Sequence, residues 1–378
     1  MNPARENLLV VAGEISGDMH AAGVIAAMKK AGRDVEVWGI GGDRLIAEGV
    51  EVRHHVRDMS VLGLVEVLKR YGFFRRVFHG MLREVDRRKP STALLVDYPG
   101  FNLRLAAQLK KRGVRVVYYI CPQVWAWHRS RIPKMAKIID HLLVIFPFEV
   151  DVFAGTGLKV EFVGHPLVEE AARVFAGPEK NLPWPGALRV ALLPGSRRQE
   201  LERLLPAMLH AAARLEGERP EAGFMLAAAS PEMKALAETI IANEPVKPRS
   251  LVLVEGATRE ILRQARAAWV ASGTATLETA LMECPMVVIY RTAALTYAIG
   301  KRLIKIPHIG MVNLLAGREL CPEIIQNAIT PERLVDAIRP LLDDTAERAA
   351  MIDGLRAVKK SLGTGGAAER VARVLSDK

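Results

Sequence analysis

Short apolar segments alternate with helical segments along nearly the whole chain, and this alternation constrains the fold more than any other feature. The apolar segments are rich in β-branched residues, bounded by Gly, Pro or Asp, and apolar almost without interruption. Strands of this kind are typical of parallel sheets that are covered by helices on both faces. The first half holds the predicted strands Leu8–Ala12, Val35–Ile40, Thr92–Val96, Val114–Ile120, His141–Phe146 and Val160–Val163. The second half holds Arg189–Leu193, Phe224–Ala228, Leu251–Val254, Ala267–Ala271 and Met286–Tyr290.

The chain is long enough for more than one domain, since 378 residues correspond to about two to three domains. The segment Phe175–Gly186 is rich in Pro and Gly and is predicted to link two domains. We therefore predict an α/β protein of two doubly wound, Rossmann-like domains that face a cleft, over residues 1–170 and 171–345. From Pro322 onward the pattern is helical, and we predict that residues 346–378 form a helical tail that could cross back to the first domain.

Two glycine turns in the second half follow predicted strands and precede predicted helices. This geometry directs backbone N–H groups and the positive end of a helix toward one point, which suits a phosphate group. Arg197 adds a guanidinium that can hold phosphate oxygens bidentately, and Glu278 can accept hydrogen bonds from ribose hydroxyls. The pair of turns indicates a nucleoside diphosphate, although the Walker pattern is absent. The candidate residues are Gly195, Ser196, Arg197, Ser272, Gly273, Thr274 and Glu278.

Two turns in the first half carry residues suited to chemistry. After the first strand, Glu14, Ser16, Gly17 and Asp18 either contact sugar hydroxyls or order the helix start, and capping is the simpler role for Asp18. Asp97 ends an apolar strand, where desolvation would raise its pKa toward that of a general base. The alternative is that Asp97 only orders the turn that follows. His165 either contacts the diphosphate or is a packed histidine at a hinge.

The net charge of +11 calls for an anionic partner or a generally basic surface. A nucleic-acid partner is disfavoured, because aromatic residues make up only 6% and no long basic block or known module is present. The segment 62–89 instead combines an apolar stripe at helical spacing with many cations, which is typical of a helix at an anionic membrane surface. The alternative is that the stripe packs on the sheet, with Val65 and Phe73 left exposed. The candidate membrane contacts are Val65, Leu68, Lys69, Arg70, Phe73 and Phe74.

The cysteines and the apolar segments limit the compartment. Cys121, Cys284 and Cys321 lie far apart and indicate buried thiols in a reducing compartment. No His, Cys, Asp or Glu cluster has metal-ligand spacing, so no metal is expected. The N-terminal apolar stretch is too short for a signal peptide, and no segment approaches the length of a membrane span. We therefore expect a cytoplasmic protein that attaches at most peripherally to a membrane.

Taken together, several motifs resemble those of lipid-A-disaccharide synthases. They occur in the family's order over nearly the whole chain, and the Trp-Ala-Trp and Asn313–Glu319 stretches are the most specific. The matching stretches are Ala12–Asp18, Asp97–Asn102, Pro122–Trp127, Pro147–Glu149, Phe162–His165, Leu192–Arg197, Ser272–Ala275, Glu278, Cys284–Val288 and Asn313–Glu319.

The resemblance implies an inverting, metal-independent glycosyltransferase with the two-Rossmann-domain GT-B architecture. Such enzymes transfer 2,3-diacylglucosamine from its UDP conjugate to the 6-hydroxyl of 2,3-diacylglucosamine 1-phosphate (lipid X). By position, Asp97 would be the base, Arg197 would hold the diphosphate, Glu278 the ribose, and Asn313 the nucleotide–sugar. Ser272, Gly273 and Thr274 would lend N–H groups to phosphate. The implied location is the cytoplasmic face of the inner membrane of a Gram-negative bacterium. The resemblance also allows a homodimer in which the tails of residues 346–378 are exchanged.

Two other classes of function remain in competition. One is another UDP-sugar enzyme on the same fold, either a UDP-N-acetylglucosamine epimerase or the peripheral transferase of the peptidoglycan lipid precursor. A soluble epimerase has no need of the stripe in residues 62–89, so vesicle binding discriminates. The other class is a basic nucleic-acid-binding protein, which salt-dependent RNA affinity would reveal.

Overall fold

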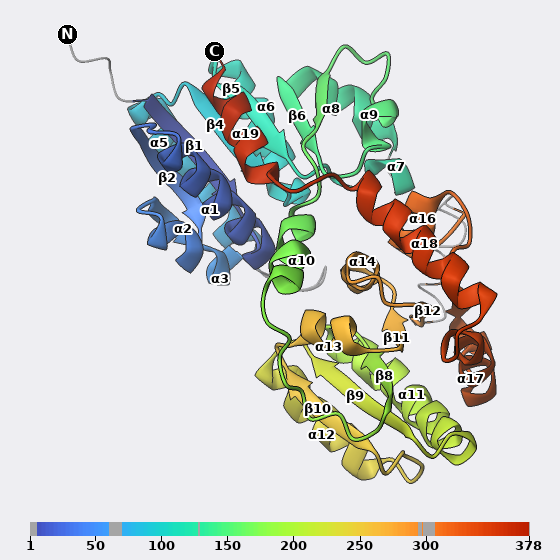
Figure 1. Ribbon diagram of the computed structural model, residues 1–378. Coiled ribbons are helices and arrows are strands. Elements are labelled where there is room, and N and C mark those ends of the chain that lie inside the picture. The colour runs from blue at the N-terminus through green and yellow to red at the C-terminus, as the bar shows by residue number, and fades with distance from the viewer. Residues whose placement is uncertain (1–5, 60–69, 128, 294–296, 298–306, 378) are drawn as a thin grey trace. The chain divides into compact units, whose positions relative to one another are not determined.

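The computed structural model describes residues 6–59, 70–127, 129–293, 297 and 307–377. The chain divides into two compact units, which are shown with the chain coloured from end to end in Figure 1. Unit 1 comprises residues 1–166 and 364–378, and unit 2 comprises residues 167–363. The division falls at 166/167, close to the predicted 170/171. The predicted tail is itself split, because residues 346–363 belong to unit 2 and the rest to unit 1.

Unit 1 is built on a parallel sheet with the strand order β3-β2-β1-β4-β5-β6-β7. The order reverses direction between β1 and β4, which makes that pair of strands the topological switch point, beside which ligands bind in sheets of this kind. The edge strand β3 has the sequence Glu-Val-Arg-His-His and is missing from our predicted strands, because its polar composition gives no apolar run. The strands are β1 Glu6–Ala12, β2 Val35–Gly41, β3 Glu51–His55, β4 Thr92–Val96, β5 Arg115–Tyr119, β6 His141–Val144 and β7 Lys159–Phe162.

Helices cover the sheet of unit 1 and complete its core. Fully buried side chains of the strands, such as Leu9 and Leu95, join one cluster with Met81 and Leu105 of the crossover helices. The helices are α1 Ile15–Lys30, α2 Asp43–Ala47, α3 Val56–Met59, α5 Tyr71–Arg88, α6 Pro99–Lys111, α7 Val124–Trp127, α8 Ile132–Ile138, α9 Glu149–Val152 and α19 Ala367–Ser376. The C-terminal α19 packs against α1.

The apolar side of α5 faces the core of unit 1. Val77, Met81 and Val85 are buried, and the three phenylalanines at 73, 74 and 78 are partly buried against the same core. The prediction that Phe73 is exposed is therefore wrong: its ring meets Phe74 edge to face, and the Arg70 guanidinium lies 4.8 Å from its centroid. The predicted membrane contacts Val65, Leu68 and Lys69 lie outside the described residues.

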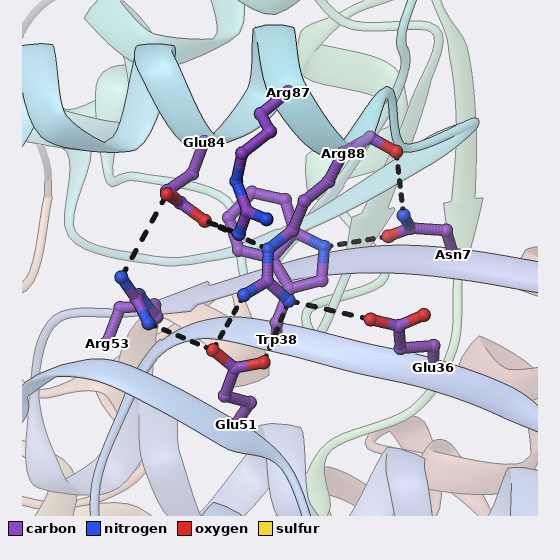
Figure 2. A network of polar contacts seen from close by, with 8 residues as sticks. All are labelled: Asn7, Glu36, Trp38, Glu51, Arg53, Glu84, Arg87 and Arg88. Atoms are coloured by element: carbon purple, nitrogen blue, oxygen red, sulfur yellow. Dashed lines mark hydrogen bonds and ion pairs between the residues drawn. The ribbon is translucent and has the colours of Figure 1, made fainter.

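Arg88 joins the end of α5 to the neighbouring strands, as Figure 2 shows. Its guanidinium donates to both carboxylate oxygens of Glu51 at 2.8 and 2.6 Å, and to Glu84 at 2.9 Å. The same group stacks on the ring of Trp38, 4.9 Å from the centroid. Trp38 in turn donates from Nε1 to Asn7 on β1. The network fixes α5 to β1, β2 and β3 at the amino end of the sheet.

Unit 2 repeats this architecture with the strand order β10-β9-β8-β11-β12-β13. Its switch point lies between β8 and β11. The short edge strand β13 contradicts the prediction that the chain is helical from Pro322 onward. The strands are β8 Leu188–Leu193, β9 Ala222–Ala228, β10 Leu251–Glu255, β11 Ala267–Ala271, β12 Met286–Tyr290 and β13 Glu323–Ile325. The α-helices are α10 Pro166–Ala176, α11 Arg198–Glu218, α12 Pro231–Asn243, α13 Thr258–Gln264, α14 Thr274–Leu281, α16 Met311–Ala316, α17 Pro331–Ile338 and α18 Ala346–Ser361.

The predicted linker Phe175–Gly186 lies inside unit 2 rather than between the units. It is held by α13, because Arg263 donates to the carbonyls of Val174 and Gly177, and Gln264 accepts from the indole of Trp184. Pro and Gly therefore mark an extended segment that is bound to a helix, and not a domain boundary.

Candidate functional site

The switch point of unit 1 brings together the turns that follow β1 and β4. Gly13 is buried under the ring of Tyr98: a Cβ atom at position 13 would lie 2.3 Å from Tyr98 Cδ1, so only glycine fits. The hydroxyl of Tyr98 donates to the carbonyl of Met59 at 3.0 Å. Glu14, next along the first turn, is exposed. The two turns are thus in direct contact.

Asp97 lies in this switch point in a strained conformation. It and Tyr98 both have positive φ, at 45° and 50°, which costs a non-glycine residue about 1–3 kcal/mol. The Asp97 carbonyl accepts hydrogen bonds from Tyr118 Oη at 2.6 Å and Asn102 Nδ2 at 2.7 Å. Asn102 also donates to Val96 at the end of β4. Neighbouring side chains therefore hold the Asp97 backbone in place.

The environment of Asp97 alters its acidity. Burial raises the pKa of Asp97 to about 6, and the negative charge of Glu14 adds to the rise, while the backbone N–H of Tyr98 opposes it. The pKa is thereby brought close to neutral pH, where a carboxylate acts well as a general base. The hydrogen bond from Tyr98 also fits the alternative role of ordering the turn, and the two roles are compatible.

Asp18 is a structural residue, which corrects its candidacy as a sugar ligand. Its carboxylate is buried and accepts from the N–H groups of Gly42, Arg44 and Leu45 at 2.6, 3.0 and 3.3 Å. Asp18 belongs to α1, but its carboxylate caps the start of α2, the helix that follows strand β2. Gly17 is buried in the first turn of α1, whereas its neighbour Ser16 is exposed, as is Glu14 just before the helix.

His165 is a packed histidine, in line with the second of its two predicted roles. Its side chain is buried, and its ring lies 5.3 Å from that of Phe146. Burial, and to a smaller extent nearby His20, lowers the pKa of His165 to about 3, so the imidazole is neutral at physiological pH. A neutral buried ring is poorly suited to holding a diphosphate.

The glycine turn after β8 has the geometry of an anion site, and a carboxylate of the chain already occupies it. Gly195 has φ of 116°, and the N–H groups of Ser196 and Arg197 donate to Glu200 Oε2 at 2.9 and 3.2 Å. The Arg197 guanidinium donates to Glu200 Oε1 at 3.3 Å, and the Arg197 side chain is largely exposed. Glu200 is absent from our predictions, although a glutamate at the third position of a helix is a recognised capping signal.

The glycine turn after β11 is only partly available to a ligand. The N–H of Ser272 donates to Ile289 at 2.8 Å and its hydroxyl to Ile309 at 3.1 Å, which corrects the prediction that this N–H binds phosphate. Gly273, with φ of 145°, and Thr274 are exposed at the start of α14. N–H groups at this position lack intrahelical acceptors, so these two remain suited to an anion.

Glu278 belongs to a cluster of two carboxylates around one guanidinium. Arg259 Nη2 lies 2.8 Å from Glu278 and 2.5 Å from Glu170 on α10. Burial raises the pKa of Glu278, and Arg259 counteracts the rise. Arg259 is a functional candidate that sequence reasoning missed, since no motif predicts that α13 lies beside α14.

Asn313 is an internal clamp, which corrects its predicted contact with the nucleotide–sugar. The side chain is fully buried, and its Oδ1 accepts from the N–H groups of Leu320 and Cys321, each at 2.9 Å. Its Nδ2 donates to the Cys321 carbonyl and to Glu323, each at 2.8 Å. These four bonds close the segment between α16 and β13.

A second buried carboxylate, Glu149, fixes the Trp-Ala-Trp segment of unit 1. It accepts from Trp125 Nε1 and from the N–H of Phe146, each at 3.1 Å. Burial raises the pKa of Glu149 to about 7, against the effect of these hydrogen bonds. Trp125 is buried, whereas Trp127 is exposed.

Among the described residues, no group of three or more His, Cys, Asp or Glu side chains is arranged to hold a metal ion. No helix in the same part of the chain is long and apolar enough to cross a membrane.

Comparisons with known proteins place the chain in one family. The family model described as lipid-A-disaccharide synthetase matches residues 8–371. The lipid-A-disaccharide synthase of Anaeromyxobacter sp. (strain K) is 43% identical over 97% of this chain and 96% of its own length, and that of Myxococcus xanthus is 41% identical over 98% and 96%.

Solved structures share the fold at low sequence identity. A UDP-N-acetylglucosamine 2-epimerase described as putative, from Listeria monocytogenes, is 15% identical with a TM-score of 0.67, over 99% of this chain and 96% of its own. The MurG protein of Acinetobacter baumannii is 12% identical with a TM-score of 0.58, over the full length of both chains. These values show a common fold, while the family follows from the sequence matches: the chain belongs to the lipid-A-disaccharide synthetase family.

Proposed function

We propose that this chain transfers 2,3-diacylglucosamine from its UDP conjugate to the 6-hydroxyl of lipid X. The products are the β-1,6-linked disaccharide 1-phosphate and UDP. The observation that carries the proposal is the family match over residues 8–371, with relatives 38–43% identical across nearly their whole length. The switch-point geometry of both units supports it.

Unit 1 supplies the base. The carboxylate of Asp97 takes the proton of the acceptor hydroxyl as that oxygen attacks C1 of the donor sugar. The bond from C1 to the diphosphate oxygen breaks at the same time, and its electron pair leaves with UDP, so the configuration at C1 inverts. The raised pKa of Asp97 favours this proton transfer, because a base with a pKa near the working pH is the most effective.

Unit 2 holds the donor nucleotide. The Arg197 guanidinium and the N–H groups of Ser196 and Arg197 point at one position, which Glu200 fills, and the diphosphate binds by displacing that carboxylate. Glu278 accepts from the ribose hydroxyls, with Arg259 keeping it ionised and oriented. Once Glu200 is displaced, the Arg197 guanidinium and the N–H groups of the turn offer the diphosphate the donors that a metal would otherwise supply.

The chain works at the surface of an anionic membrane, on the cytoplasmic face of the inner membrane, because both of its sugar substrates carry acyl chains. Support comes from the outer face of α5, on which Tyr71, Arg75, Arg76 and Arg83 are exposed. Residues 364–377 pack on unit 1 of their own chain, so a homodimer with exchanged tails would have to replace that packing.

A product assay tests the function. Purified protein is mixed with UDP-2,3-diacylglucosamine and lipid X in detergent, with chelator present, and the products are analysed by mass spectrometry. The expected result is a disaccharide 1-phosphate with stoichiometric UDP. If UDP binds but no disaccharide forms, the acceptor is wrong. Release of a free sugar epimer instead would replace the transferase with an epimerase.

A further inference from the structure

Exposed apolar side chains gather at the carboxyl end of the sheet of unit 1. Ile15 and Met19, in the first turns of α1 after β1, are 72% and 40% exposed. Trp127, at the end of α7 after β5, is 54% exposed, and Val150, on α9 after β6, is 36% exposed. We call these four residues the apolar rim. The other large apolar side chains exposed in the described part of unit 1 are Ile46 and Tyr71.

The strand order places the rim on both sides of Asp97. In the sheet, β1 is next to β4, β4 next to β5, and β5 next to β6. The carboxyl ends of parallel strands meet at one edge, so Asp97, which follows β4, lies between the turn that carries Ile15 and the segment that carries Trp127. A polar reacting group is therefore flanked by apolar surface.

The rim residues stay exposed although the residues beside them are packed into unit 1. Neighbours of the rim residues fill the core in the usual way: Val24 and Ile25 of α1 are buried, and Trp125 is anchored to Glu149. The anchored Trp125 holds its segment in place and leaves Trp127 outside. Large apolar side chains that are exposed together at a catalytic edge are typical of a binding surface for an apolar ligand.

We propose that the apolar rim binds the acyl chains of the acceptor lipid and so orients its 6-hydroxyl toward Asp97. The inference rests on the proposed function, which gives the acceptor two acyl chains and a polar sugar. The sugar lies at the polar centre of the edge, beside Glu14 and Asp97, and the chains lie along the flanking apolar side chains. Contact removes apolar surface of both partners from water, which stabilises the complex.

Kinetics with two acceptors test the assignment. The double variant Ile15→Ser/Met19→Ser is compared with Val246→Ser, a control at a side chain 48% exposed between α12 and β10 of unit 2. With long-chain lipid X, the double variant should lose at least tenfold in kcat/KM, mainly through KM. With glucosamine 1-phosphate, which lacks acyl chains, it should match the wild type within twofold. The control should match the wild type with both acceptors.

A binding measurement separates this inference from the proposed function. Tryptophan emission is recorded while short-chain 2,3-diacylglucosamine 1-phosphate is added below its micelle concentration, and Trp127→Phe identifies the signal of Trp127. A saturable blue shift that the double variant weakens supports the rim even if no disaccharide is ever made. The inference would be overturned if the wild type makes disaccharide and the double variant has the same KM for lipid X. It would also be overturned if the double variant lost only its binding to vesicles, or if its kcat/KM fell equally with both acceptors.

Discussion

At the scale of single residues, Asp97 combines features that work against stability. Its φ is positive, its carboxylate is partly removed from water, and Glu14 places a like charge nearby. A residue present only to order a turn would need neither a carboxylate removed from water nor a like charge nearby. Strain and desolvation concentrated on one side chain are typical of functional sites, where geometry is maintained at the expense of folding free energy.

The pH dependence of stability follows from this environment. In the unfolded chain the pKa of Asp97 is near its ordinary value of 3.8, and in the folded protein it is raised to about 6. The folded state therefore binds the proton more tightly, so the free energy of unfolding falls as the pH rises from about 4 to about 6, and the loss persists above that range. Asp97→Asn removes this effect and should stabilise the protein by roughly 1–3 kcal/mol near pH 8, with no gain below about pH 4.

The substitution that stabilises the fold should lower the activity. Since the base must be ionised, wild-type kcat/KM should rise with pH through about 6, and Asp97→Asn should lower turnover by at least ~100-fold while UDP still binds. Thermal unfolding at two pH values and a pH–rate profile measure both effects. A variant that is destabilised and still active would assign Asp97 to the turn alone.

Glu200 leads to a second residue-scale prediction. Because its carboxylate occupies the donors of the β8 turn, it competes with the diphosphate and repels its charge. Glu200→Gln should bind UDP severalfold more tightly in calorimetry, and Arg197→Ala should bind it at least severalfold more weakly. Glu202→Gln, on the exposed side of the same helix, is the control and should leave affinity unchanged. Weaker binding by Glu200→Gln would mean that the carboxylate organises the turn for the nucleotide.

At the scale of elements, α5 depends on Arg88 for its attachment at the amino end of the sheet. The Arg88 side chain is only 11% exposed, whereas that of Arg87 is 62% exposed and contacts the same Glu84. Arg88→Met removes the bonds to Glu51 and the stacking on Trp38, and should lower the free energy of unfolding by about 2 kcal/mol. Arg87→Met, the matched control, should change it by less than about 0.5 kcal/mol. Urea unfolding measures both, and equal effects would show that the network adds no stability.

Sequence patterns predict a strand well where both of its faces are buried. They predict it poorly where only tertiary contacts determine whether the segment joins a sheet. β4, β11 and β12 match their predicted ranges, because both faces are largely buried and the runs are apolar apart from Thr92 at the start of β4. β3 and β13 are short, partly polar edge strands, and nothing local distinguishes them from loops.

The candidate site shows the same limit. The glycine turns and Asp97 are recognisable from local chemistry alone. The occupation of the β8 turn by Glu200, the pairing of Arg259 with Glu278 and the capping of α2 by Asp18 depend on which segments the fold brings together. The prediction that Asn313 contacts the nucleotide–sugar was wrong for the same reason: the sequence shows the motif that contains Asn313, but it does not show that the side chain is buried.

At the scale of the whole molecule, the chain returns to its starting unit. Arg370 on α19 donates to the carbonyl of Val163 at 2.7 Å, and Arg115 on β5 donates to Val374 at 3.0 Å. The amphipathic pattern of the tail indicates a helix but does not identify its partner. Unit 1 therefore needs both ends of the chain, whereas unit 2 is formed by one continuous segment.

The distribution of positive charge gives the last prediction. The net charge of +11 could attract a membrane from any side, but the proposed function requires contact near the carboxyl end of unit 1, where α5 begins. Arg75→Glu/Arg76→Glu reverses two exposed charges there. Lys30→Glu/Lys111→Glu, at the exposed ends of α1 and α6, makes the same change in net charge at the opposite edge of the sheet.

Sedimentation with anionic vesicles at low salt compares the two variants. Each cation near an anionic surface contributes about 1 kcal/mol, so reversal at Arg75 and Arg76 should weaken binding at least ~30-fold, and the control should weaken it only slightly. Added salt should reduce the difference, because the attraction is screened. Equal losses in the two variants would show that net charge alone governs binding, and would remove α5 from the contact surface.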